Sequence, residues 1–171
     1  MKTNRIQKIL TTLGLLVIVV LLAGCPYSSS VPIDEGTIKI PLKLAGEWIG
    51  SADVQSENPI YIAITIEDEF HAQAKKMEYS SSDSAYSATT YNLTFSDVKG
   101  EIFMNVIEDG GDAYSLYKFD FDENTGEINT SEVTDYIKET FNTSEELKDF
   151  ISKNKSNSYF FTNTNENYVR K

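Results

Sequence analysis

The amino-acid sequence predicts a mainly β protein with some helix (α+β): an antiparallel meander that closes into a small barrel or sandwich, with two short helices near the C-terminus. Three observations lead to this fold class. From residue 44 to about residue 130, short segments alternate apolar and polar residues with the period of two that half-buried strands show. Turn signals separate these segments at intervals of about ten residues. Beyond residue 131 the apolar residues adopt helical spacing.

The expected strand at residues 60–66 shows the alternation most clearly. Every second residue from Ile60 to Ile66 is isoleucine, and the residues between them are tyrosine, alanine and threonine. One face of this strand is therefore expected to be buried. Clusters of serine, aspartate, asparagine and glycine mark the turns between this strand and the others. The other six strands are expected within 44–52, 69–79, 89–95, 100–108, 113–121 and around Ile128.

Two helices and two closing strands are expected after the meander. Residues 131–141 and residues 142–155 each place apolar side chains three and four positions apart, which is the spacing of one helix face. Thr143 and Glu146 predict a capping box at the start of the second helix. Because the apolar stripes suit packing, both helices are expected to cover the barrel. The chain is then expected to end in two strands, at 158–163 and 167–171.

The first 25 residues have the pattern of an exported bacterial lipoprotein. A basic start precedes residues 9–23, which carry no charge; this run is shorter than the roughly 20 apolar residues that a spanning helix needs and suits a signal-peptide core. Leu22-Ala23-Gly24-Cys25 then resembles the bacterial lipobox. The resemblance implies cleavage between Gly24 and Cys25, and attachment of acyl chains, such as palmitate, to Cys25. These chains would anchor the protein to a membrane.

Three segments are therefore predicted: a signal peptide at 1–24, a lipidated tether at 25–43 and a single β-rich domain at 44–171. The tether prediction rests on three prolines, three serines and the lack of a sustained period in that segment. Without residues 1–24 the chain keeps 12 of its 15 basic residues and all 26 acidic ones, so its formal charge is −14. This charge repels nucleic acid. A single cysteine also excludes an internal disulfide.

Gly46-Glu47-Trp48 resembles the Gly-x-Trp start of lipocalin-like (calycin) barrels. The resemblance implies a small lipocalin-like barrel in which Trp48 packs at the closed end. It also implies a basic partner for the indole ring from near the C-terminal end, and Arg170 is the candidate through cation–π stacking.

The whole chain is similar to a family of small bacterial lipoproteins of uncharacterised activity. The similarity is carried by "LAGC", "VPID", "LAGEW", "YSLYKFDF" and "TSEELKDFISKN". It implies an envelope location and a small β domain with helical additions, and it implies no activity. Position 26 is proline, where many inner-membrane lipoproteins have aspartate, and no acidic cluster directly follows Cys25. Both features favour the periplasmic face of the outer membrane.

The sequence predicts no catalytic site, metal site or cofactor. His71 is the single histidine and is expected in mid-strand, without a nucleophile near it in the sequence. The segment "DFDENTGEI" begins like a calcium-binding loop at Asp120, but Thr125 and Ser131 replace the glycine and glutamate that such a loop requires. A hairpin turn is therefore expected there. The acidic residues lie at expected strand ends beside turns, where solvated acids are ordinary and do not indicate a catalytic pair. An enzyme is therefore not expected.

Ten tyrosines remain as candidates for a binding role. Tyr61, Tyr91 and Tyr117 fall on expected strands and could face a ligand at a barrel mouth, although sheet positions favour tyrosine in any case. The function predicted is a lipid-anchored, non-enzymatic accessory module that binds a protein partner in the envelope. The alternative is a lipocalin-like carrier of a small apolar ligand. An open interior cavity lined by Tyr and Phe would favour the carrier, and an exposed apolar patch on a filled barrel would favour the protein partner.

Overall fold

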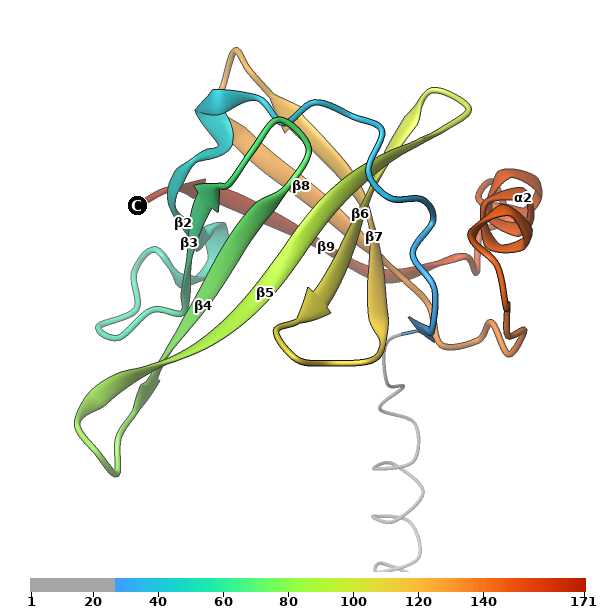
Figure 1. Ribbon diagram of the computed structural model, residues 1–171. Coiled ribbons are helices and arrows are strands. Elements are labelled where there is room, and N and C mark those ends of the chain that lie inside the picture. Colours follow the sequence, from blue (N-terminus) through green and yellow to red (C-terminus); the bar gives the residue numbers. More distant parts are fainter. Residues whose placement is uncertain (1–26) are drawn as a thin grey trace, which may run out of the picture.

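The computed structural model describes residues 27–171, without the side chains of Asn163 and Thr164. Eight antiparallel strands form a closed, lipocalin-like barrel (Figure 1). Neighbours around the barrel follow the order of the chain, and pairing of the last strand with the first closes the ring. The predicted fold class is confirmed. The strands are β2 (Gly46–Gly50), β3 (Tyr61–Ile66), β4 (Ala72–Ser80), β5 (Ala85–Val98), β6 (Glu101–Glu108), β7 (Tyr114–Asp122), β8 (Glu127–Val133) and β9 (Phe161–Arg170).

The alternation of side chains along each strand gives the barrel an inside and an outside. On β3, Ile62 and Ile64 belong to the inner cluster, and on β4 the buried Ala74 does the same. Tyr61 and Ala63 alternate with these isoleucines and therefore face outward. The short 3₁₀ helix η1 (Leu42–Leu44) lies before β2 at one end of the barrel. A second one, η2 (Ser51–Asp53), follows β2 at the other end.

A second apolar core lies outside the barrel wall, under helix α2 (Ser144–Asn154) (Figure 1). Leu147 and Ile151 of the helix are buried together with Phe103 of β6 and Phe160, which precedes β9. The predicted cap is present: the Thr143 hydroxyl oxygen accepts a hydrogen bond from the Glu146 amide at 3.3 Å. The Glu146 carboxylate, in turn, accepts one from the backbone amide of Asn142 at 3.2 Å.

The predicted helix at 131–141 is wrong. Its first residues complete β8, where Val133 pairs with Phe161 of β9, and the remainder forms a loop that leads to α2. Ile137 is buried in the outer core, whereas Tyr136 is 75% exposed. The apolar residues of this segment are therefore three and four positions apart because a strand end and a packed loop bury them, and not because the segment is a helix. The two predicted closing strands are likewise one continuous strand, β9. Within residues 27–171, α2 is the only α-helix, and no helical segment there has the length and hydropathy of a membrane span.

The predicted tether is also wrong for its described part, residues 27–43. This segment runs along the outside of the barrel (Figure 1), starting with β1 (Ser28–Ser29), which pairs with the beginning of β7. Tyr27 and Ile33 are buried in the outer core, and Ile40 is buried at the barrel end near η1. The alternating apolar residues among the prolines supply this packing, so the folded domain begins at least as early as residue 27. Gly24 and Cys25, the predicted cleavage and lipidation site, lie outside the described residues.

Candidate functional site

The barrel interior contains a cavity of about 730 Å³. This volume is within the range of small-molecule binding sites, which is roughly 300 to 1,000 Å³. Most of its wall consists of apolar side chains that alternate inward along the strands, because every second residue of a closed sheet must point inside. These include Ile62, Ile64, Leu93, Met104, Val106 and Phe119.

Trp48 forms part of the cavity floor and is 1% exposed. Its indole Nε1 donates a hydrogen bond to the Leu44 carbonyl oxygen at 2.8 Å, which joins β2 to η1. The Arg170 guanidinium carbon lies 4.3 Å from the centre of the indole ring. This is the cation–π contact that the resemblance to lipocalin-like barrels implies. Arg170 also donates hydrogen bonds to the carbonyl oxygens of Ala45 (2.7 Å) and Lys43, so it ties the end of β9 to the segment before β2.

The geometry explains why glycine precedes Trp48 by two residues. Gly46 has a φ of +136°, a conformation that L-residues rarely adopt. A Cβ atom at this position would lie 1.9 Å from Nη1 of Arg170. The Gly-x-Trp pattern is therefore a packing requirement of the barrel end, where glycine leaves room for the guanidinium that covers the tryptophan.

Two tyrosine–carboxylate pairs lie in or beside the cavity. The Tyr117 hydroxyl donates a hydrogen bond to Oε1 of Glu132 at 2.9 Å. The Tyr168 hydroxyl donates one to Oε2 of Glu166. Burial, and after it the negative charge of Glu132, raises the pKa of Tyr117 above its ordinary value. Burial and the hydrogen bond to Glu166 raise the pKa of Tyr168 in the same way. Both phenols therefore stay neutral and remain hydrogen-bond donors to their carboxylates at ordinary pH.

The structure places two of the three predicted ligand-facing tyrosines, Tyr91 and Tyr117, on the cavity wall. The third prediction, Tyr61, is wrong. It is outside the cavity because it alternates with the inward-facing Ile62, and its ring contacts the Lys171 ammonium (Nζ 3.4 Å from the ring centre) and the ring of Tyr86. Sequence reasoning missed Tyr168. The sequence offered one signal for Tyr168: it lies two residues before Arg170 and therefore on the same face of the last strand.

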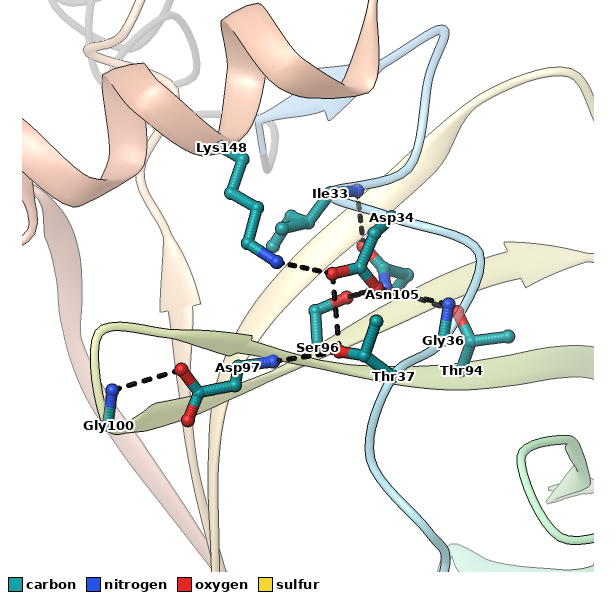
Figure 2. A network of polar contacts seen from close by, with 10 residues as sticks. All are labelled: Ile33, Asp34, Gly36, Thr37, Thr94, Ser96, Asp97, Gly100, Asn105 and Lys148. Atoms are coloured by element: carbon teal, nitrogen blue, oxygen red, sulfur yellow. Dashed lines mark hydrogen bonds and ion pairs between the residues drawn. The ribbon is translucent and has the colours of Figure 1, made fainter.

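A buried polar network connects the N-terminal segment, the barrel wall and α2 on the outside of the barrel (Figure 2). Asp34 accepts hydrogen bonds from Nζ of Lys148 and from Oγ of Ser96, both at 2.6 Å. Asn105 donates through Nδ2 to Oγ of Ser96 at 3.0 Å and accepts from the Ile33 amide at 2.8 Å. Asn105 and Ser96 are 1% and 0% exposed. No substrate can reach this serine, so the network holds three elements together.

The remaining candidates for chemistry are surface features. Nδ1 of His71 lies 2.8 Å from the Asp68 carboxylate, in the exposed loop between β3 and β4. His71 therefore precedes β4, and its predicted place in mid-strand is wrong. The segment that resembles a calcium loop is a hairpin turn, as predicted, in which Asp122 pairs with Glu127 across β7 and β8. The Asp122 carboxylate accepts a hydrogen bond from the Asn124 amide at 2.8 Å. Among residues 27–171, no group of three His, Cys, Asp or Glu side chains is arranged to hold a metal ion.

Comparison with protein-family models finds none that matches the chain, and comparisons with curated proteins and with solved structures find no match either. The cavity is consequently the part of the described chain that best supports an inference about function.

Proposed function

We propose that this chain is a lipid-anchored binding protein of the bacterial envelope, whose lipocalin-like barrel carries a small, largely apolar ligand. The observation that supports this most is the interior cavity of about 730 Å³. A barrel of eight strands can be filled by its own side chains or can hold one small ligand. The cavity volume favours the second arrangement, and it favours the carrier over the module that binds a protein partner. Binding to a protein partner remains a prediction from the sequence.

The distribution of polar groups supports an amphipathic ligand. The deep part of the cavity is formed by Trp48, Leu93 and Phe119, which are all buried. The opposite end, near η2, carries Asp53 and Glu108. An apolar body would therefore lie toward the tryptophan, and a polar head group would lie toward the mouth, where it keeps its hydrogen bonds with water or protein.

The start of the described chain supports an orientation relative to the membrane. Ser28 and Ser29 pair with Ser115 and Tyr114 at the beginning of β7, and Ser115 lines the mouth of the cavity. Cys25 is two residues before Tyr27, and two residues reach at most about 7 Å. Acyl chains on Cys25 would thus hold the cavity mouth close to the lipid surface, from which a membrane-derived ligand could enter.

The cavity can be tested with the single tryptophan of the chain as the reporter. We would reconstitute the full lipidated chain in phosphatidylcholine vesicles and titrate it with 6-bromohexan-1-ol, whose bromine quenches indole fluorescence on contact. Saturable quenching of Trp48 is expected, because the indole lies on the cavity floor. Linear quenching without saturation would contradict the proposal.

A matched pair of variants identifies where the probe binds. Ala74→Phe adds a ring to the cavity wall, whereas Ala63→Phe makes the same change on the outward face of the neighbouring strand. The first variant should weaken the binding of the probe about tenfold or more, since the ring fills space that the probe needs, and the second should leave binding unchanged. Equal effects would show that the probe binds elsewhere.

The anchor is tested separately. Cys25→Ser should abolish labelling of the chain by radioactive palmitate in a bacterial host and leave uncleaved precursor, since the thiol that accepts the lipid is gone. Ser30→Ala, a small change in the same segment, serves as the control and should be labelled like the wild type. Normal labelling of Cys25→Ser would remove the anchor from the proposal and leave the carrier function standing.

A further inference from the structure

We infer that the cavity selects ligands whose polar head is a cation or a strong hydrogen-bond donor, such as an alkyl ammonium group. The inference rests on the proposed function, since it names the chemical class of the ligand for the same cavity. It is carried by the charges along the cavity, by the direction of its tyrosine hydrogen bonds and by its aromatic faces.

The charged residues of the cavity wall are mainly acidic. Asp53, Glu108 and Glu166 line it, and Lys76 is the one basic residue among the described lining residues. Lys76 is already neutralised, because its Nζ lies 2.8 Å from Oε1 of Glu78. Glu108 and Glu166 are exposed and Asp53 is half-buried, so they form an acidic rim to the apolar cavity. A cationic head group would therefore meet an excess of negative charge there. An anionic head group would meet repulsion from the same residues.

The tyrosines reinforce this preference because their hydroxyl hydrogens are already donated to carboxylates. Tyr117 donates to Glu132, and Tyr168 donates to Glu166. Each hydroxyl can then offer a ligand only the lone pairs of its oxygen, which accept hydrogen bonds. The carboxylates are acceptors as well. The two tyrosine–carboxylate pairs thus present hydrogen-bond acceptors, and a ligand that brings donors satisfies them.

The pKa of Tyr117 illustrates how the site treats a negative charge. Burial and then the charge of Glu132 raise this pKa, and the charge of Glu166 acts in the same direction. The phenolate is disfavoured because burial weakens its hydration and because the nearby carboxylate charge repels it. A carboxylate or phosphate on a ligand would face the same surroundings. An ammonium group would be paired, and the rings of Tyr91 and Tyr117 on the wall offer faces on which a cation is stabilised.

The test compares three probes with the same six-carbon bromoalkyl chain: 6-bromohexylammonium, whose head group is both a cation and a hydrogen-bond donor, 6-bromohexan-1-ol and 6-bromohexanesulfonate. Each is titrated against the full chain in phosphatidylcholine vesicles, and quenching of Trp48 reports occupancy. We expect the ammonium probe to bind about tenfold more tightly than the sulfonate or better, which corresponds to the contribution of one good charge interaction, with the alcohol between them.

The double variant Glu132→Gln/Glu166→Gln keeps the size of both side chains and an acceptor for each tyrosine while removing both charges. It should lower the advantage of the ammonium over the sulfonate at least about threefold and leave the alcohol unchanged, while Asp53 and Glu108 keep part of the preference. Glu145→Gln, on the exposed first turn of α2, removes charge far from the cavity and should preserve the preference. Melting temperatures of both variants confirm that they are folded.

The outcomes separate the inference from the proposed function. If the alcohol binds and the ammonium shows no advantage over the sulfonate, the inference is overturned while the carrier function stands. If the preference is undiminished in Glu132→Gln/Glu166→Gln, or disappears in Glu145→Gln, the selection does not come from the tyrosine–carboxylate pairs and the inference is overturned. If none of the three probes quenches Trp48 saturably, the proposed function fails, and the inference fails with it.

Discussion

Where α2 covers the barrel, the wall has an apolar cluster on each face, but only the outer cluster is fully packed. On β6, Phe103 points outward and is 0% exposed between the wall and α2. Its neighbour Met104 points inward, is only partly buried and lines the cavity. The outer core thus resembles an ordinary protein interior, filled to high density. The inner one leaves volume unfilled, which lowers stability and provides space for a ligand. The comparison indicates that the packing that stabilises the fold is concentrated outside the barrel and that the unfilled volume lies inside it.

The largest effect should come from truncating the outer core. Phe103→Ala should lower the free energy of unfolding by about 3 to 5 kcal/mol, because it opens a void in a filled region. Met104→Ala, on the opposite face of the same strand, should cost less than about 2 kcal/mol, since its side chain already borders open space. Urea denaturation of both variants measures the difference. Equal losses would mean that the two faces are packed alike.

The second-largest loss of stability should come from a substitution in the buried polar network. Asn105→Ala leaves the buried Ile33 amide without its partner, and such an unsatisfied group costs about 1 to 3 kcal/mol. It also removes the hydrogen bonds that Asn105 donates to Ser96 and Thr94, each worth about 0.5 to 1.5 kcal/mol. We expect a total loss of about 2 to 4 kcal/mol. Asn165→Ala removes an exposed side-chain hydrogen bond with Ser131 and should change stability by less than about 0.5 kcal/mol. Thermal denaturation distinguishes the two, and a small effect at Asn105 would mean that water replaces its partners.

The pH dependence of stability tests the charge in this network. Burial would raise the pKa of Asp34, but hydrogen bonds from Lys148, Ser96 and the Gly36 amide prevail and lower it. A carboxyl whose pKa is lower in the folded state stabilises the fold above the unfolded pKa of about 3.9, and this contribution is lost as pH falls through the folded value.

Asp34→Asn should therefore be less stable than the wild type by about 1 to 2 kcal/mol at pH 6. The two proteins should converge below about pH 3. Urea titrations at several pH values measure this. If the difference in stability does not vary with pH, the loss in Asp34→Asn comes from the geometry of the amide and not from the missing charge.

The smallest effect is expected inside the barrel. Tyr117→Phe removes the hydrogen bond to Glu132, yet it should cost only about 1 kcal/mol or less, because the carboxylate borders a cavity that water can enter. Tyr61→Phe, on the outside of the barrel, should cost almost nothing. Differential scanning calorimetry can resolve the pair. A loss above about 2 kcal/mol at Tyr117 would contradict the view that the interior contributes little to stability.

Several features follow from the sequence because their causes are local. The alternation at Ile60–Ile66 predicts a strand with one buried face, Thr143 and Glu146 predict the start of α2, and Asn124-Thr125-Gly126 predicts a hairpin turn. Each depends on residues within about one turn or strand of one another. The contact between Trp48 and Arg170 joins the two ends of the domain and was predictable only through the resemblance to lipocalin-like barrels.

Other features depend on which distant segments meet, and local patterns misrepresent them. Residues 131–141 have helical spacing, but β8 extends to Val133 because a partner in β9 is available. Residues 27–43 look like a tether, but Ile33 and Ile40 are covered by a barrel wall and end that form from later residues. Asp34 and Lys148 are 114 positions apart and meet only after the barrel, the N-terminal segment and α2 have assembled.

The strands of the meander, their turns, the start of the capped helix and the acidic character of the chain were predictable from the sequence, because alternation, capping and charge are properties of neighbouring residues and of composition. Whether the barrel is filled or hollow, which tyrosines face its interior and where the second core lies became known only from the assembled fold. Cavity volume depends on the closure of eight strands and on the summed size of all inward side chains. No segment of the chain carries that information alone.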